Sequence, residues 1–396
     1  MENSSSHQTL AIVSRQSNIT KRILLGIASY VKSNESWALC PFELEEESLS
    51  KKIQDQCIGT IIIDNGELDE EEKLNITQSA PTVVIGGEET DMIPGVFRTD
   101  DHAIATIAAN TFLDRGFETL GFAGAMAYSE VRARYQSYSA ELEKHNISPF
   151  VFSSNYHLGS TRSLRKKEDS PTRRRLTEWI TDLPSPIGIF AADDVMAFEV
   201  FQAAIRVGKR IPEDLALLGV NDDEFLCRIT NPSMSSIRLP FERMGFDAAK
   251  LISKMVKHGN SFELKGNVYQ PIGLIARESI KTVVVEDEIV RGALLYIQEN
   301  YMNLINVEDI LHELGVSRSL LERRFRDAMG VTPLVELRRY RIEKARALLS
   351  DTNESIHDMG KRCGFASAIR FTTVFKEQVG MTPTEFRKRM LPAARN

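Results

Sequence analysis

The chain has 396 residues, a length that favours two or three domains over one. Apolar residues make up 42% of it and charged residues 26%, as in an ordinary soluble globular protein. The four cysteines form no CxxC pair, which argues against a disulfide framework or a zinc ribbon. The polar N-terminus resembles no signal segment, and no apolar run is long enough to span a bilayer, so we expect a cytoplasmic protein without membrane contact.

Charge is distributed unevenly along the chain. The formal net charge is -6, but residues 318–396 hold 17 Lys and Arg against 9 Asp and Glu, a balance of +8. Residues 1–317 therefore carry -14. A basic segment on an acidic body is typical of a region that faces nucleic acid, with a solvated helical surface as the alternative.

From Thr9 onward, short apolar runs alternate with amphipathic stretches. The apolar runs predict buried strands at 10–14, 59–64, 81–86, 119–124, 187–193 and 215–222. The amphipathic stretches predict helices at 20–34, 102–116, 194–208 and 241–259. This alternation predicts an α/β body of doubly wound parallel sheets, in which ligands bind beyond the carboxyl ends of the strands.

Polar residues gather at those predicted strand ends: 14–16, 64–65, 193–194 and 221–223. The paired acids suit acid–base or metal chemistry, but the chain has no Gly-x-Gly-x-x-Gly helix opening or Walker loop, and its histidines lack metal-ligand spacing. We therefore expect no catalytic site, metal or cofactor. Two interpretations remain for the acids: a helix N-cap, above all for Asp194, or hydrogen-bond partners of a neutral polyol.

A basic stretch interrupts the acidic body between Arg162 and Arg175, in "HLGSTRSLRKKEDSPTRRRLTEW". Its composition predicts a mobile solvated loop. The alternative is a contact with DNA or with a partner subunit.

Residues 8–280 resemble the effector domain of the LacI/GalR family. The likeness is carried by "FRTDDHAIATIAANTFLDRGFETLGFAG", "AADDVMAFEVFQAAIRVGKRIPEDLALLGVNDDEF" and "PIGLIARES". It implies a two-lobed periplasmic-binding-protein-like fold, a homodimer and a sugar effector. The positions that it implies for ligand contact, with their neighbours at the strand ends, are Ser14, Gly86, Arg134, Asp193, Asp194, Asn221 and Asp222.

This chain departs from that family in two respects. Asp193 stands where the family usually has asparagine, and Asn221 where it has aspartate, so the acid and the amide exchange places. The predicted sheet also begins within about ten residues of the start, which leaves no room for the family's N-terminal DNA-binding headpiece. We expect DNA binding to lie at the other end of the chain.

The basic segment contains an internal repeat. Ser317, Leu321 and Phe325 recur 50 residues later as serine, phenylalanine and phenylalanine, and "GVTP" recurs as "GMTP". Each unit predicts helix, tight turn and helix, with a serine N-cap opening the second helix. The helix from about Arg318 to Met329 and its counterpart each turn one apolar face inward and one polar face outward.

Such outward faces suit the DNA major groove. The stretch between the units predicts one helix of about sixteen residues from Pro333, a strut that would hold the two recognition helices apart. Two helices spaced in this way could enter successive major grooves, about 34 Å apart on one DNA face.

The tail resembles the AraC/XylS DNA-binding domain. "GVSRSLLERRFRDAMGVTP", "RIEKARALL" and "GFASAIRFTTVFKEQVGMTPTEFRK" carry the likeness. Together with the outward faces, it implies these contacts with operator DNA: Arg318, Ser319, Glu322, Arg323, Arg326, Ala368, Ile369, Arg370, Thr372, Thr373 and Lys376. Two departures are visible: Leu311 replaces the family's small alanine, and Ala368 and Ile369 are poor hydrogen-bonders.

A LacI/GalR-like body followed by an AraC/XylS-like tail resembles the arrangement of bacterial xylose regulators. We divide the chain into an effector domain at 8–280, a stiff linker at 281–288 and a DNA-binding domain at 289–396. The resemblance implies a sugar-responsive transcription regulator that binds operator DNA, takes a xylose-like pentose as effector, and recruits RNA polymerase if it activates. The alternative function is a sugar sensor that acts through protein contacts and binds DNA only weakly.

Overall fold

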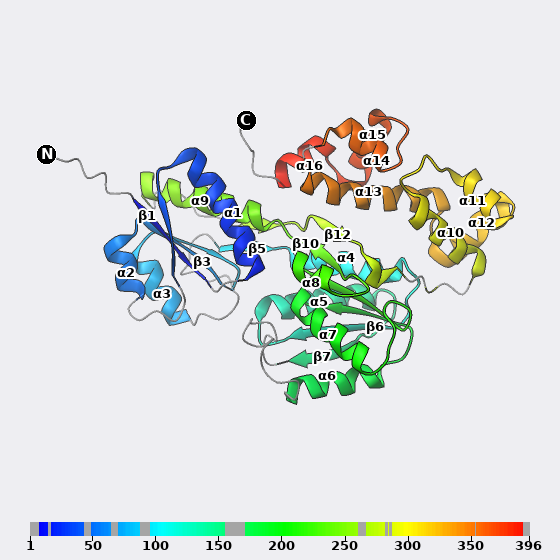
Figure 1. The fold of residues 1–396 in the computed structure, drawn as a ribbon, viewed down its shortest axis with the longest axis horizontal. Helices are drawn as coiled ribbons and strands as arrows, with labels where there is room; N and C mark the ends of the chain where they lie inside the picture. The colour runs from blue at the N-terminus through cyan, green and yellow to red at the C-terminus, as the bar shows by residue number, and fades with distance from the viewer. Residues whose placement is uncertain are drawn as a thin grey trace.

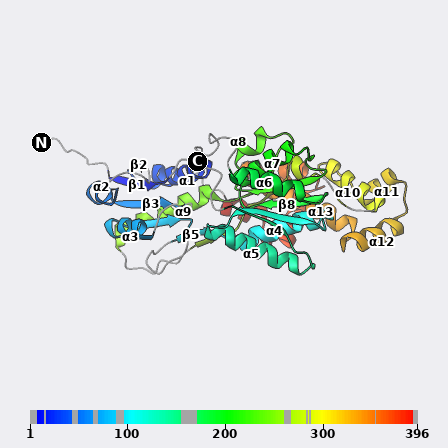
Figure 2. The ribbon, with the colours of Figure 1, turned by 90° about the horizontal axis from the view of Figure 1, so that it is seen from below.

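The computed structural model describes residues 8–14, 17–42, 49–64, 70–87, 96–154, 171–259, 267–281, 284, 287–352 and 354–390. They form two α/β lobes and a helical tail that lies along one side of the body (Figure 1). Figure 2 shows the first lobe at one end, the second lobe in the middle and helices α10–α12 of the tail at the other end.

The first lobe is a six-stranded sheet in the order β11-β5-β4-β3-β1-β2, with parallel neighbours. Isoleucine, valine and leucine fill its central strands, which are buried on both faces and therefore carry continuous apolar runs. Its elements are β1 (Thr9–Val13), α1 (Asn18–Asn34), β2 (Ala38–Phe42), α2 (Leu49–Gln56), β3 (Gly59–Ile63), α3 (Glu70–Ser79), β4 (Thr82–Ile85), β5 (Val96–Thr99), α9 (Phe241–His258) and β11 (Asn267–Tyr269).

The second lobe has a six-stranded sheet in the order β12-β10-β9-β8-β6-β7, with β12 antiparallel to β10 at the edge. The chain passes between the lobes after β5, after β10 and after β11, so the lobes share three crossings. Its elements are α4 (Asp101–Leu113), β6 (Leu120–Ala125), α5 (Ser129–Glu143), β7 (Phe150–Ser154), α6 (Pro171–Asp182), β8 (Ile187–Ala191), α7 (Asp194–Arg206), β9 (Leu215–Val220), α8 (Glu224–Ile229), β10 (Ser235–Arg238) and β12 (Gly273–Ile275).

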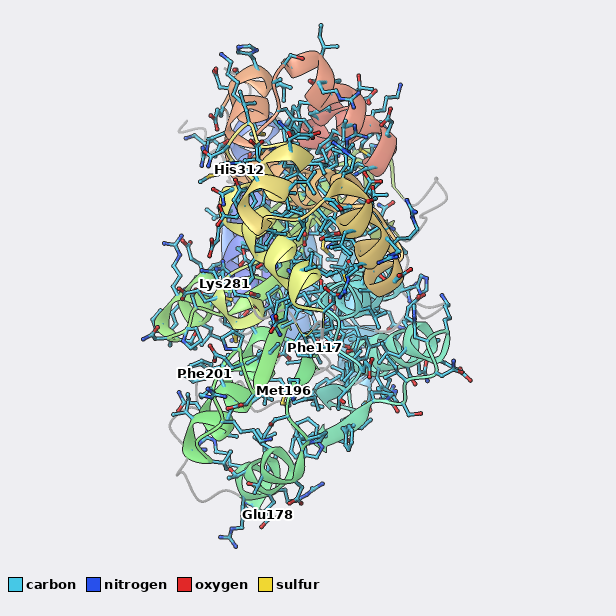
Figure 3. All side chains as sticks on the ribbon, turned by 90° about the vertical axis from the view of Figure 1, so that its right-hand side faces the viewer. Phe117, Glu178, Met196, Phe201, Lys281 and His312 are labelled. Atoms are coloured by element: carbon cyan, nitrogen blue, oxygen red, sulfur yellow. The ribbon has the colours of Figure 1, made fainter. Side chains whose placement is uncertain are left out.

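The tail consists of two helix-turn-helix units joined by one long helix. A 3-10 turn at Glu278–Ile280 precedes it, and each unit has an apolar core of its own. Its helices are α10 (Glu288–Asn300), α11 (Val307–Leu314), α12 (Arg318–Met329), α13 (Pro333–Asp351), α14 (Ile356–Arg362), α15 (Ala368–Val379) and α16 (Pro383–Met390). Figure 3 places His312 on the tail, Met196 and Phe201 in the second lobe, and Lys281 at the level where the two meet.

The prediction of one loop from residue 162 to 175 is wrong at its end. Residues 162–170 lie outside the described part, but α6 begins at Pro171. Arg173 is buried and its guanidinium pairs with the carboxylate of Glu199 at 2.7 Å. The partner of Arg173 is distant in sequence, so the basic run gave no sign that this arginine is part of the core.

Candidate ligand pocket and nucleic-acid interface

The ends of β8 and β9 bring acidic residues together in the second lobe. Asp193 is the N-cap of α7, and its Oδ1 accepts a hydrogen bond from the amide of Met196 at 2.7 Å. Asp194, the first residue of that helix, is fully buried, and its Oδ2 accepts from the amide of Asp223 at 2.6 Å. Burial raises the pKa of the Asp194 carboxyl well above its usual value. The capping interpretation therefore applies to Asp193, whereas Asp194 buttresses the loop after β9.

That loop contains two residues in an unusual backbone conformation. Asn221 and Asp222 have φ values of 104° and 53°, in a region that residues other than glycine rarely adopt. The amide of Asp222 donates to Oγ of Ser236 at 2.9 Å, which helps to hold the loop in this shape. Strained backbone of this kind gathers at binding sites, where the surrounding structure fixes it.

Asp222 is the centre of a buried ion-pair cluster. Its two carboxylate oxygens accept hydrogen bonds from Nε of Arg238 and Nη2 of Arg277, each at 2.6 Å. Burial alone would raise the pKa of the Asp222 carboxyl, but the two guanidinium charges outweigh it and hold the pKa below its usual value. Asp222 therefore joins the end of β9 to β10 and to the segment that follows β12.

Arg134 of α5 is buried at the edge of the same lobe. Its Nε donates to Oδ1 of Asp101 at 2.7 Å, and its Nη1 donates to the carbonyl oxygen of Ala192 at 2.6 Å. These contacts fix the guanidinium between the start of α4 and the end of β8. A guanidinium held in this way still has further N–H groups to offer a ligand.

The first lobe contributes the ends of β1, β3 and β4. Ser14 is buried after β1, and Asp64 after β3 pairs with Nζ of Lys73 at 2.7 Å. Gly86 has a φ of 89°, and a Cβ there would lie 2.2 Å from the carbonyl oxygen of Asp64, so only glycine fits. The structure thus places Ser14 and Gly86 in one lobe, and Arg134, Asp193, Asp194, Asn221 and Asp222 in the other.

Polar contacts link the two lobes directly. Nδ2 of Asn18 donates to the carboxylate of Asp223 at 2.6 Å. Arg22 donates to the carbonyl oxygens of Asn221 and Leu239, at 2.8 and 2.9 Å. Helix α1 of the first lobe is thereby tied to the strained loop of the second.

Sequence reasoning missed several of these functional neighbours. Arg277 and Arg22 meet an acid and a carbonyl that lie far away along the chain, whereas the partners of Lys73 and Arg238 belong to a neighbouring element. Their local patterns are those of ordinary helix and strand residues. Three-dimensional pairing was the only signal that could have found them.

The tail presents two recognition helices with serine N-caps. Ser317 caps α12 and Ser367 caps α15, and both helices end at a left-handed glycine, Gly330 and Gly380. Leu321 and Phe325 of α12 are buried, as are Phe371, Val374 and Phe375 of α15. The predicted inward and outward faces and the bounds of α12 are therefore confirmed.

On α12, two of the four arginines are engaged within the tail. Arg318 pairs with Glu308 and Glu322, and Nη1 of Arg324 pairs with the carboxylate of Asp287 at 2.7 Å. Arg323 and Arg326 are exposed and form no ion pair with any other residue that the structure describes. Their charges are thus available to a partner from outside the chain.

Helix α15 presents a less polar surface. Ile369 is 81% exposed, and Thr373 and Lys376 stand beside it on the outward face. These side chains, with Ala368 and Thr372, line a surface groove of about 780 Å³. Arg370, also exposed, lies about 100° further round the helix from Ile369.

Helix α13 docks the tail on the body. Nη1 of Arg339 pairs with the carboxylate of Asp114 at the end of α4 at 2.5 Å, and Nζ of Lys344 donates to the carbonyl oxygen of Ala276 at 3.3 Å. Ile272, just before β12, is part of the apolar core of the second unit. Burial raises the pKa of the Asp114 carboxyl to about 6, although Arg339 opposes the shift.

Neither a metal site nor a membrane span emerges from the described ranges. No group of three or more His, Cys, Asp or Glu residues in them could hold a metal ion. None of their helices combines the length and the apolar character that crossing a bilayer requires.

Comparisons with known proteins agree with this architecture. Residues 109–280 match the family of the periplasmic binding protein-like domain, and residues 310–389 match the helix-turn-helix domain. The xylose operon regulatory protein of Haemophilus influenzae is 27% identical over 379 residues, which cover 93% of this chain and 94% of that protein. The protein of the same description from Escherichia coli K12 is 26% identical over 390 residues, covering 96% and 97%.

A solved structure shares the whole fold. The structure of the xylose-binding transcription activator xylR aligns with a TM-score of 0.59 at 22% identity and covers 97% of this chain and 98% of its own. The predicted order, a two-lobed α/β body followed by a tandem helix-turn-helix tail, is confirmed. The chain is similar along almost its whole length to these two xylose operon regulatory proteins.

Proposed function

We propose that the chain is a sugar-responsive activator of an operon for pentose use, with a xylose-like pentose as its effector. One observation carries the proposal. Helix α13 joins both recognition helices, and it packs on the lobe that holds the strained loop at Asn221 and Asp222. The names of the full-length relatives support the choice of xylose.

The tail is the proposed operator-binding domain, at 289–396, with 281–288 as its linker to the effector domain at 8–280. Helix α13 has 19 residues, which corresponds to a length of about 28 Å. Two helices held at its ends are suited to successive major grooves, which repeat about every 34 Å. In this assignment Arg323 contacts a base edge, while other basic residues of the tail contact phosphates.

The strand ends of the two lobes are the proposed sugar site. Arg134 and Asp193 offer a guanidinium and a carboxylate, and Asn221 offers an amide. Charged partners form the stronger hydrogen bonds with hydroxyl groups. Because Arg22 and Asn18 tie α1 to the loop after β9, a sugar that closes the lobes would move that loop and, through Arg277, the segment next to α13.

A homodimer formed through the body is the proposed assembly. On α8, Phe225 is 62% exposed and Ile229 lies one turn further along the same face, also exposed. Leu25 is an exposed apolar residue on α1, the helix whose Asn18 contacts the start of α8. A second copy covering these side chains would bring two tails to two half-sites and raise affinity by avidity. RNA polymerase is the further partner of an activator, and the cytoplasm is its compartment.

Operator preference tests the proposed function. The full chain is titrated onto the DNA upstream of its own gene and onto random duplex of equal length, at several salt concentrations. We expect tighter binding to the upstream DNA, because specific contacts add to a salt-dependent phosphate contribution. Equal affinity for both DNAs would reject the regulator proposal and favour a sensor that acts through protein contacts.

A thermal-shift screen against pentoses and hexoses identifies the effector. A ligand at 100 times its dissociation constant raises the free energy of unfolding by about 2.7 kcal/mol, which gives a clear shift. Linkage then requires that operator DNA change the affinity for the sugar by the same factor by which the sugar changes the affinity for DNA. Identical sugar affinity with and without operator would mean that the sugar acts after DNA binding.

A further inference from the structure

The two recognition helices present chemically different surfaces at equivalent positions. With the offset of 50 residues, Arg318, Ser319, Glu322 and Arg323 of α12 correspond to Ala368, Ile369, Thr372 and Thr373 of α15. Three charged residues and a serine are thus replaced by two apolar residues and two threonines. Both helices have a serine N-cap and end at a left-handed glycine, but their inner faces differ at one position, because Val374 of α15 is buried where α12 has the exposed Arg324.

Ile369 dominates the outward face of α15. With 81% of its surface exposed, it is the most exposed large apolar side chain among the described residues. It contributes almost nothing to the core, where Phe371, Val374 and Phe375 fill the space instead. Folding therefore does not explain an isoleucine at this position, whereas a partner that covers it would.

The threonine next to it adds to the apolar character. Oγ1 of Thr373 donates to the carbonyl oxygen of Ile369 at 3.0 Å, in the pattern of a hydroxyl bound to its own helix. That hydroxyl is occupied, and the methyl group remains as the part of the side chain that can meet a partner. The groove of about 780 Å³ is lined by Ala368, Ile369, Thr372, Thr373, Lys376, Glu377 and Thr382.

We propose that α15 reads the 5-methyl groups of thymines, and that Ile369 is its specificity-determining residue. In the major groove, the thymine methyl is the one apolar group that base pairs present, and it is recognised by apolar contact. Lys376 provides a charge for a phosphate beside that contact. The proposal rests on the proposed function, operator binding by the tail. It adds that α15 binds an A·T-rich half-site, whereas Arg323 of α12 binds a half-site that contains guanine.

Uracil substitution tests the proposal with the full chain and its preferred upstream DNA. Replacing single thymines of the α15 half-site by uracil removes only the methyl group and keeps the base pair. At one or two positions we expect the affinity to fall about fourfold, the factor that corresponds to about 0.8 kcal/mol for one methyl-sized group. Replacing the thymines of the α12 half-site by uracil should have no such effect, because Arg323 of α12 contacts guanine.

A double-mutant cycle then assigns the contact to one side chain. Ile369→Ala should bind the thymine operator more weakly than the unmodified chain and should lose no further affinity when thymine is replaced by uracil. Ile369→Val should keep most of the loss of affinity that uracil causes in the unmodified chain. Arg323→Ala, the control on the other helix, should keep the full uracil effect. Thermal unfolding of Ile369→Ala should match the unmodified chain, because the side chain is exposed.

The outcomes separate the two proposals. Suppose that the chain prefers its upstream DNA, and that uracil lowers the affinity of Ile369→Ala as much as that of the unmodified chain. This result would overturn methyl reading by Ile369. Operator preference without any uracil effect would overturn methyl reading by α15 altogether. Absence of operator preference would instead reject the proposed function itself.

Discussion

Charged side chains are used in opposite ways at the strand ends of the body and on the outward faces of α12 and α15 in the tail. At the strand ends of the second lobe, Asp222 and Arg134 are buried, and each already contacts protein partners. On the tail, Arg323 and Arg326 are exposed and have no ion-pair partner in the described part of the chain. The charges at the strand ends of the body are thus already paired within the protein, whereas Arg323 and Arg326 remain available to a partner from outside the chain.

The largest expected loss of stability comes from disrupting the buried ion pairs of the body. Asp222→Asn removes the charge that compensates Arg238 and Arg277, and breaking a buried ion pair at one side costs about 3–5 kcal/mol. We expect chemical denaturation to show a loss of this size. Asp214→Asn, which disrupts an exposed pair with Arg210, is the matched control and should change stability far less.

The same carboxylate predicts a pH dependence. The pKa of Asp222 is lower in the folded chain than in the unfolded chain, so its contribution is present above the unfolded value of about 3.9. That contribution is lost as the pH falls through the folded-state pKa. The difference in stability between the unmodified chain and Asp222→Asn should therefore shrink on acidification, and a constant difference would contradict the ion-pair account.

The next prediction concerns the affinity for the sugar. Arg134→Ala removes hydrogen bonds from a charged group, each of which contributes about 1.5–3 kcal/mol, so sugar affinity should fall roughly ten- to hundredfold. Calorimetry with the effector from the thermal-shift screen measures this loss. Sugar-free DNA binding should stay normal, and the response of DNA binding to sugar should be lost.

The control for Arg134 lies on the same helix. Arg132 of α5 is exposed and contacts the carbonyl oxygens of Met126 and Ala127. Arg132→Ala should leave sugar affinity close to that of the unmodified chain. An equal loss in both variants would mean that α5 as a whole, and not the guanidinium of Arg134, determines affinity.

On the tail, a comparable substitution should leave stability intact. Arg323→Ala removes the bidentate base contact that we propose for this side chain, and the loss of one such contact costs about 1–3 kcal/mol of discrimination. We expect the preference for operator over random DNA to fall by that amount, with sugar affinity and thermal unfolding unchanged. Equal weakening on both DNAs would assign Arg323 to phosphate.

The same contrast explains what could be predicted from the sequence. The tail was predicted nearly to the residue, because Ser317, Gly330 and Pro333 are local signals that start and stop helices. The prediction for α13 was too short, since the helix continues to Asp351. In the body, the central strands were found, but β2, β5, β7 and the three last strands were not.

The missed elements and residues depend on distant parts of the chain. Strand β12 exists because it pairs with β10, and Arg277 contacts Asp222, which lies 55 positions earlier. Neither fact leaves a periodic pattern within a few residues. The candidate site was therefore predicted as a set of strand ends, whereas the ion pairs that hold those ends together were visible only in three dimensions.

A small effect on stability is expected where the body and the tail meet. Arg339 of α13 and Asp114 form an ion pair about one-third exposed, and such pairs contribute at most about 1 kcal/mol. Arg339→Ala should nevertheless reduce the factor by which sugar changes DNA affinity, because it removes a direct tie between body and tail. Arg338→Ala is the matched control: the neighbouring arginine has no ion pair among the described residues.

Repeating the Arg339→Ala measurement at two pH values distinguishes an ion pair between Arg339 and Asp114 from a packing contact. The pKa of Asp114 is about 6, so its carboxyl is mostly ionised at pH 7.5 and largely protonated at pH 5.5. Protonation removes the negative partner of Arg339, and the difference between Arg339→Ala and the unmodified chain should shrink as the pH falls through 6. A difference of the same size at both pH values would mean that Arg339 acts through packing or through Glu336, its other partner.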